Sequence, residues 1–109
     1  MKEKMTECYI GIGSNIGHRE KNISKAIEFI GQKERILSVS SLIETEPEYY
    51  LHQRRFLNCA ILISTLKNPK ELLSFLQQIE HTMKRKRVIT YGPRIIDLDI
   101  LFYHHKIMN

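Results

Sequence analysis

Two aspartates, Asp97 and Asp99, interrupt an otherwise apolar run over residues 95–103. Such a run predicts a buried β-strand, in which alternate side chains point to the same face. Both carboxylates would then lie side by side, where their like charges repel each other. A Mg²⁺ ion completed by phosphate oxygens and water would relieve this repulsion. Salt bridges to arginines, such as Arg94, are the alternative explanation.

A second pair, Phe56 and Asn58, opens another apolar run at residues 56–64. The same alternation places both side chains on the face of the sheet that carries the carboxylates. An aromatic ring can stack on a flat heterocycle, and a carboxamide can hydrogen-bond its edge. A core phenylalanine beside a surface asparagine is the simpler alternative.

Positive charge gathers at residues 84–87 and at Arg94, in a chain of net charge +5 and pI near 9.3. Arginine makes bidentate contacts with phosphate, so these residues suit phosphoryl transfer, although a solvated basic turn is the alternative. The net charge favours anionic partners without choosing among nucleic acid, phosphorylated ligands and acidic surfaces. Residues 11–15 lack the Gly-Lys-Ser/Thr ending of a Walker motif, which argues against a P-loop kinase.

The elements that must position these residues follow from the apolar spacing. Strands are predicted at residues 8–13, 36–45, 56–64 and 95–103, with the third strand central and buried on both faces. Residues 46–55 are predicted to form a long functional loop. One helix is predicted from Glu20 to about Gln32, and another begins with a capping box at residues 68–71. This second helix should bury Leu72, Leu76, Ile79 and Met83.

The element order is β-α-β-β-α-β, which predicts a ferredoxin-like α+β fold, an antiparallel sheet with two helices on one face. We expect one domain over residues 1–109, and a cytoplasmic location because the sequence shows no signal-type or membrane-spanning run. Cys8 and Cys59 should be buried and reduced. In the last strand, the side chains expected to face the helices are Ile96, Leu98, Ile100 and Phe102.

Residues 92–101, Gly-Pro-Arg-Ile-Ile-Asp-Leu-Asp-Ile-Leu, resemble the motif of the 6-hydroxymethyl-7,8-dihydropterin pyrophosphokinase family. Residues 9–15, 39–41, 44–47 and 56–58, together with Gln53, extend the resemblance along essentially the whole chain. It ends just before the family's Pro-His-Pro segment, which implies a C-terminally short domain. Tyr91 departs from the tryptophan of many members, and the loop at residues 87–91 is one residue shorter.

The resemblance implies transfer of pyrophosphate from ATP to the hydroxymethyl group of the dihydropterin, releasing AMP, with two Mg²⁺ ions. No protein nucleophile is required, because the substrate hydroxyl attacks the β-phosphorus in line. By resemblance, the metal ligands are Asp97 and Asp99, and the catalytic residues are Arg85 and Arg94. The residues that the resemblance assigns to pterin binding are Thr45, Glu46, Glu48, Phe56 and Asn58. Those that it assigns to ATP binding are Gln77, Glu80, Arg85, Arg87, Arg94 and Ile100.

Three interpretations remain open at this stage. The chain is a truncated active enzyme, a short family member that is inactive or completed by another chain, or a basic ferredoxin-like module that binds RNA. Against the third, the aspartate pair lies on the face that would meet RNA and repels its phosphates. We expect no nucleic-acid or membrane partner, and self-association through the truncated end is an open expectation. His104 and His105 are expected to be exposed and not to replace the family's missing histidine.

Overall fold

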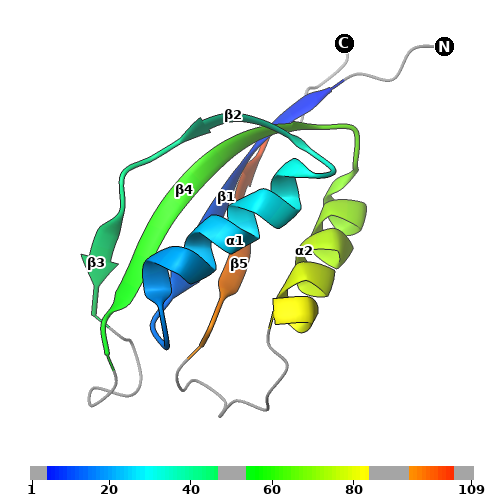
Figure 1. Cartoon of the computed structure of the whole chain (residues 1–109). Helices are drawn as coiled ribbons and strands as arrows, with labels where there is room; N and C mark the ends of the chain where they lie inside the picture. Colours follow the sequence, from blue (N-terminus) through cyan, green and yellow to red (C-terminus); the bar gives the residue numbers. More distant parts are fainter. Residues whose placement is uncertain (1–4, 47–53, 84–93, 105–109) are drawn as a thin grey trace, which may run out of the picture.

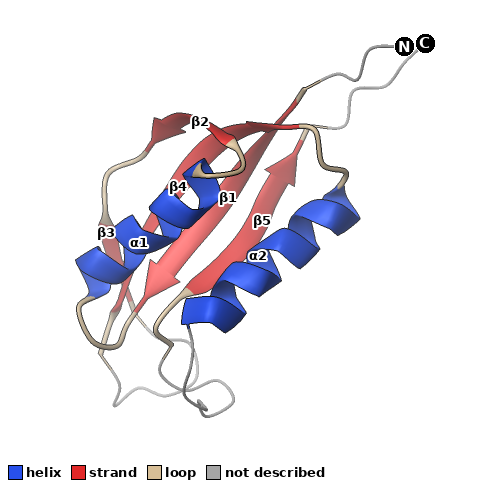
Figure 2. Ribbon diagram, turned by 45° about the vertical axis from the view of Figure 1, so that its right-hand side comes forward, coloured by secondary structure: helices blue, strands red, loops and turns tan. Residues whose placement is uncertain are grey.

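The computed structural model describes residues 5–46, 54–83 and 94–104. Its five strands form one antiparallel sheet in the order β2-β4-β1-β5, with β3 also paired to β4. Both helices cover the same face of this sheet (Figures 1 and 2), as a ferredoxin-like fold requires. The elements are β1 (Thr6–Ser14), α1 (Arg19–Gly31), β2 (Arg35–Val39), β3 (Ile43–Thr45), β4 (Phe56–Thr65), α2 (Pro69–Met83) and β5 (Asp97–Tyr103).

The predicted strand at residues 36–45 is two strands in the structure. Between β2 and β3, the backbone N–H of Ser40 donates to the carbonyl oxygen of Ala60 at 2.9 Å, and the Ser40 hydroxyl accepts from the Ala60 N–H at 2.8 Å. A serine side chain that competes with its own backbone for a ladder partner interrupts regular strand pairing. The prediction of one continuous strand is therefore wrong, although both pieces follow the same edge of β4.

The core lies between the helices and one face of the sheet. In β4, buried and half-buried residues alternate strictly, because only the face beneath the helices is covered. The prediction of a central strand is confirmed, but its burial on both faces is not. The buried face predicted for α2 is confirmed, since Leu72, Leu76 and Ile79 are buried and Met83 packs against the core. The fully buried apolar side chains come from every layer and include Ile10, Ile12, Ile30, Ile61, Ile63, Leu72, Leu76 and Ile96.

The last strand contains an irregularity that changes which side chains face the helices. Tyr9 pairs with Phe102, whereas the next residue, Ile10, pairs with Ile100, so Leu101 is an extra residue in the ladder. An inserted residue reverses the alternation beyond it. Phe102 therefore pairs with a residue of the open face and is 57% exposed, so the prediction that it faces the helices is wrong. Tyr103 packs on the core instead.

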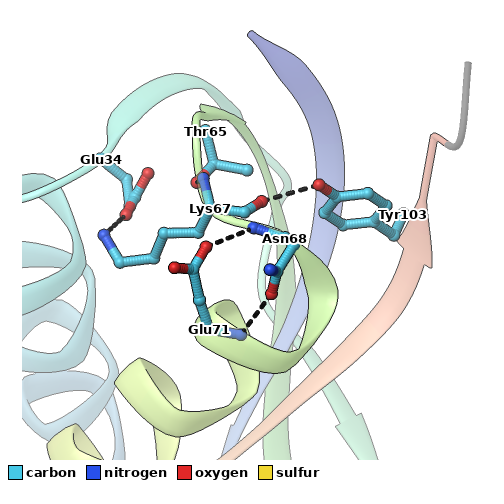
Figure 3. Close-up of polar contacts among 6 residues, drawn as sticks. All are labelled: Glu34, Thr65, Lys67, Asn68, Glu71 and Tyr103. Atoms are coloured by element: carbon cyan, nitrogen blue, oxygen red, sulfur yellow. Dashed lines mark hydrogen bonds and ion pairs between the residues drawn. The ribbon is translucent and has the colours of Figure 1, made fainter. Parts of the chain in front are cut away.

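An ion pair joins the loop between α1 and β2 to the loop between β4 and α2 (Figure 3). The carboxylate of Glu34, which follows α1, binds the ammonium group of Lys67, which precedes α2, and the Glu34 side chain is only 3% exposed. The same ammonium lies 4.7 Å from the centre of the Phe75 ring. The Tyr103 hydroxyl donates to the Lys67 carbonyl oxygen at 2.7 Å, which ties β5 to the same loop.

The capping box predicted at the start of α2 is confirmed (Figure 3). The Asn68 side-chain oxygen accepts from the Glu71 N–H at 2.8 Å, and the Glu71 carboxylate accepts from the Asn68 N–H at 2.9 Å. Two N–H groups at the helix start are thereby satisfied. Neither described helix is long and apolar enough to cross a membrane. Both cysteines are free and buried, as expected.

Lys67→Ala should destabilise the fold by about 3 kcal/mol, because it leaves the buried Glu34 carboxylate without its partner. The exposed Lys70, in the first turn of α2, offers a matched control whose alanine variant should change stability by about 0.5 kcal/mol or less. Urea unfolding measures both values. Equal effects of the two substitutions would show that the ion pair contributes nothing.

Stability should depend on the Cys8 thiol at high pH. Burial, assisted by the negative charge of Glu34, raises the pKa of Cys8 from 9.0 to about 11. The fold thus favours the neutral thiol, a contribution that is complete below pH 9 and lost between pH 9 and about 11. The free energy of unfolding of the wild type should therefore fall more steeply over this range than that of Cys8→Ala. Parallel pH profiles for the two proteins would contradict this account.

Candidate functional site

The site is built on the open face of the sheet, opposite the helices. The strand register forms two rows across it: Asn58 of β4 pairs with Gly13 of β1, which pairs with Asp97 of β5. Two residues further along, Gly11 pairs with Asp99. Directly paired residues point to the same face, so both carboxylates lie on the side that carries the Asn58 carboxamide. The predicted common face is confirmed.

The middle of each row is a glycine, and neighbouring side chains of β4 and β5 occupy the space that a side chain there would fill. A methyl group at Gly13 would lie 2.6 Å from Oδ1 of Asn58 and 3.4 Å from the Phe56 ring. One at Gly11 would lie 3.1 Å from the Leu101 side chain. Glycine inside a strand often marks a place where a ligand approaches the backbone closely.

The β3–β4 side of the open face carries the residues predicted to bind the pterin. Nδ2 of Asn58 donates to the Thr45 hydroxyl at 2.6 Å, so the carboxamide is held with its oxygen over Gly13. The Phe56 ring lies beside the same glycine. Glu46 pairs with Arg55 at 2.9 Å on the exposed surface, which fixes it only weakly.

The β5 side carries the two aspartates, one half-buried and one exposed. Their α-carbons are about 6.7 Å apart along the strand, two residues at the usual rise. Carboxylate oxygens are the ligands that Mg²⁺ prefers, and it commonly takes one or two of them together with water and phosphate. The two carboxylates therefore fit a magnesium ion whose remaining ligands are phosphate oxygens and water. Within the described residues, no third acidic, histidine or cysteine side chain joins them in a metal-binding group.

Of the residues predicted to contact ATP, Glu80 and Ile100 meet at the outer edge of β5. From α2, Glu80 accepts a hydrogen bond from the backbone N–H of Leu98 at 2.7 Å. That N–H points away from β1, and by ladder alternation the backbone groups of Ile100 point to the same outer edge. Gln77 is exposed on the same helix. The Glu80 side chain thus reaches β5 from α2, at the edge opposite the pairing with β1.

Arg94 is held by its backbone just before β5. Its N–H donates to the Asn15 side chain at 2.7 Å, and its carbonyl oxygen accepts from the Asn15 N–H at 3.0 Å. The predicted residues Glu48, Arg85 and Arg87 lie outside the described residues, as does the turn at residues 91–93.

Sequence reasoning overlooked three residues that shape this site: Gly11, Gly13 and Asn15. The sequence did contain a signal for Gly11 and Gly13, because glycine weakens a strand and usually marks a bulge, a bend or a close approach to the backbone. The role of Asn15 had no comparable signal, because its partners lie 39 and 79 residues away.

Comparison with known proteins gives a consistent assignment. The sequence profile of the 7,8-dihydro-6-hydroxymethylpterin-pyrophosphokinase family matches residues 9–108. The 2-amino-4-hydroxy-6-hydroxymethyldihydropteridine pyrophosphokinase of Bacillus subtilis is 44% identical over 101 residues, which cover 91% of this chain and 60% of that protein. The bifunctional protein FolKE of Lactococcus lactis strain IL1403 is 41% identical over 101 residues, covering 91% and 29%.

A plant protein gives a similar result. The mitochondrial folate synthesis bifunctional protein of Pisum sativum is 46% identical over 98 residues, covering 89% of this chain and 19% of that protein. The chain thus spans 60% or less of the length of these three relatives. The family profile matches nearly the whole of this chain, which therefore belongs to the 7,8-dihydro-6-hydroxymethylpterin-pyrophosphokinase family.

Proposed function

We propose that this chain provides the pterin-binding and magnesium-binding surfaces of a pyrophosphokinase that acts on 6-hydroxymethyl-7,8-dihydropterin and ATP. The observation that carries the proposal is the row in which Asn58, Gly13 and Asp97 pair across three strands. Two strand spacings separate its outer members, about 10 Å. A flat ring system at the Asn58 end and a metal-bound phosphate at the Asp97 end would lie on either side of Gly13.

The pterin end is suited to a planar heterocycle with donors on its edge. The Phe56 ring would stack on one face of the pterin. One N–H of the Asn58 Nδ2 donates to Thr45, and the carboxamide oxygen lies over Gly13, where it can accept a hydrogen bond. Thr45, Glu46 and Glu48 would contact the same ring, as the family resemblance implies.

The metal end is suited to a polyphosphate. Asp97 and Asp99 would hold Mg²⁺, which neutralises phosphate charge and orients the β-phosphorus when it is bound. The hydroxymethyl oxygen attacks that phosphorus, and the bond from it to the oxygen shared with the α-phosphate breaks, so that AMP leaves. Arg85 and Arg94 would stabilise the charge that develops on the phosphate oxygens. Arg87, Gln77, Glu80 and the backbone of Ile100 would hold the rest of ATP.

The RNA-binding alternative is less well supported. An RNA-binding sheet of this fold stacks bases on exposed aromatic rings and surrounds them with basic side chains. Among the described residues, the exposed aromatics Tyr9 and Phe102 share their face with Asp97 and Asp99, whose charges repel a phosphate backbone. Membership of a pyrophosphokinase family also favours the small-molecule substrates.

Asp97→Asn and Asp99→Asn should each weaken magnesium-dependent binding of a non-hydrolysable ATP analogue at least about tenfold, because each removes a full ligand charge. Calorimetry with and without Mg²⁺ measures this effect. Glu20→Gln, an equal change of charge at an exposed position on α1, should leave the affinity unchanged. Nucleotide binding that is tight without Mg²⁺ and insensitive to both aspartates would refute the proposed metal site.

Gly13→Ala should abolish pterin binding while the domain stays folded. The new methyl group would displace the Asn58 carboxamide, and the Gly13 backbone has no positive φ that would exclude alanine. Binding of Mg²⁺ and the ATP analogue should change little, since the clash lies on the β4 side. Gly31→Ala, at the end of α1, is the control. Fluorescence titration with the pterin tests the pair, and unaltered pterin affinity in Gly13→Ala would place the ring elsewhere.

A further inference from the structure

The residue that follows β1 joins the starts of two other strands. Asn15 is only 1% exposed. Its Oδ1 accepts from the backbone N–H of Arg94 at 2.7 Å, and its Nδ2 donates to the carbonyl oxygen of Arg54 at 3.1 Å. A further bond runs from the Asn15 N–H to the Arg94 carbonyl oxygen at 3.0 Å. One buried carboxamide therefore links two segments that are distant in sequence.

The two linked segments lead into the two halves of the site. Arg54 comes two residues before Phe56 and four before Asn58, whereas Arg94 comes three residues before Asp97. Figure 1 shows the end of β1 and the starts of β4 and β5 at the same, lower end of the sheet. Regular pairing with β1 begins only at Leu57 in β4 and at Asp97 in β5. Before these residues, where the chain no longer pairs regularly with β1, the Asn15 side chain provides hydrogen bonds to both segments.

The turn that carries Asn15 is itself held in place. Nδ2 of Asn22 donates to the Ile16 carbonyl oxygen at 2.9 Å and lies 3.2 Å from the Ser14 hydroxyl. The Arg54 guanidinium donates to the Gly17 carbonyl oxygen at 3.0 Å. The turn is therefore also held by bonds that do not involve Asn15, so loss of the Asn15 carboxamide alone should not unfold it.

We infer that Asn15 is a positioning residue, which sets the separation between the pterin half and the metal–nucleotide half of the site. The inference rests on the proposed function. A carboxamide is needed because the bridge requires an acceptor and a donor from one short planar group, which neither aspartate nor alanine supplies. Loss of the bridge disturbs the spacing between the two ligands more than the contacts of either one. The complex with both ligands should therefore suffer most.

The test compares three variants of the 109-residue chain with the wild type. Pterin affinity is measured alone and with a saturating magnesium-bound, non-hydrolysable ATP analogue, and the analogue is also titrated alone. In Asn15→Ala, each ligand alone should bind within about threefold of wild type, whereas pterin binding in the presence of the nucleotide should fall about tenfold or more. Asn15→Asp keeps the acceptor for Arg94 and loses the donor to Arg54, so it should show an intermediate loss.

Asn22→Ala is the matched control, because it removes an asparagine of α1 that holds the same turn, and so tests a general loosening of that turn, without removing a bond to Arg54 or Arg94. It should retain the wild-type ratio between pterin affinities with and without nucleotide. If Asn15→Ala keeps that ratio, or if Asn22→Ala changes it equally, the inference is overturned. A uniform loss for every ligand in Asn15→Ala would show a merely structural role.

A ligand-free measurement separates this inference from the proposed function. Amide hydrogen exchange at Arg94 should be slow in the wild type and in Asn22→Ala, and fast in Asn15→Ala, with shifted amide resonances at Asn58 and Asp97. If these changes occur but the wild type binds neither ligand, the bridge stands and the proposed function falls. If exchange at Arg94 is the same in all four proteins, the inference falls even where both ligands bind.

Discussion

The register of β1 against its two neighbours is the constraint on which the site depends. Gly13 meets Asn58 on one side and Asp97 on the other, and Gly11 meets Asp99. Because side chains alternate with period two, a slip of one residue in either pairing would send one half of the site to the helix face. The apolar residues that alternate with these positions prevent such a slip, since they would have to leave the core. Packing on the helix face of the sheet therefore determines which side chains lie next to one another on the open face.

Carboxylates have different environments in the core and on the open face of the sheet. Glu34 is almost fully buried and is satisfied by the ammonium group of Lys67, which lies over an aromatic ring. Asp97 and Asp99 instead lie on the uncovered face, where water and a metal can reach them. A buried charge contributes to one fixed structure when it is paired, whereas two neighbouring like charges on an open face repel each other and attract cations. The difference comes from position in the sheet and not from residue type.

Period-two reasoning predicted the common face of the aspartates with Phe56 and Asn58, whereas the helical spacing of apolar residues predicted the buried face of α2 and residues 68–71 predicted its capping box. Period-two reasoning failed where pairing, and not sequence, decides the geometry. The extra residue Leu101 reverses the alternation before Phe102, and Ser40 interrupts an otherwise continuous edge. Neither event has a local signature, because an inserted residue is defined only relative to the partner strand. The bridge made by Asn15 was hidden for the same reason, since its partners are brought together only by the fold.

Transfer between two bound molecules makes a stricter demand than binding either one. A displacement of about 1 Å between reacting groups can cost on the order of a hundredfold in rate, even when each ligand keeps its own contacts. In this sheet, the ladder fixes the sideways spacing of β4 and β5 through β1, but only where pairing is regular. The residues proposed to hold the two ligands lie near the ends of these strands, where the regular ladder stops. The proposed reaction would therefore require a rigid connection at that end, and a buried carboxamide with both its polar atoms engaged supplies one.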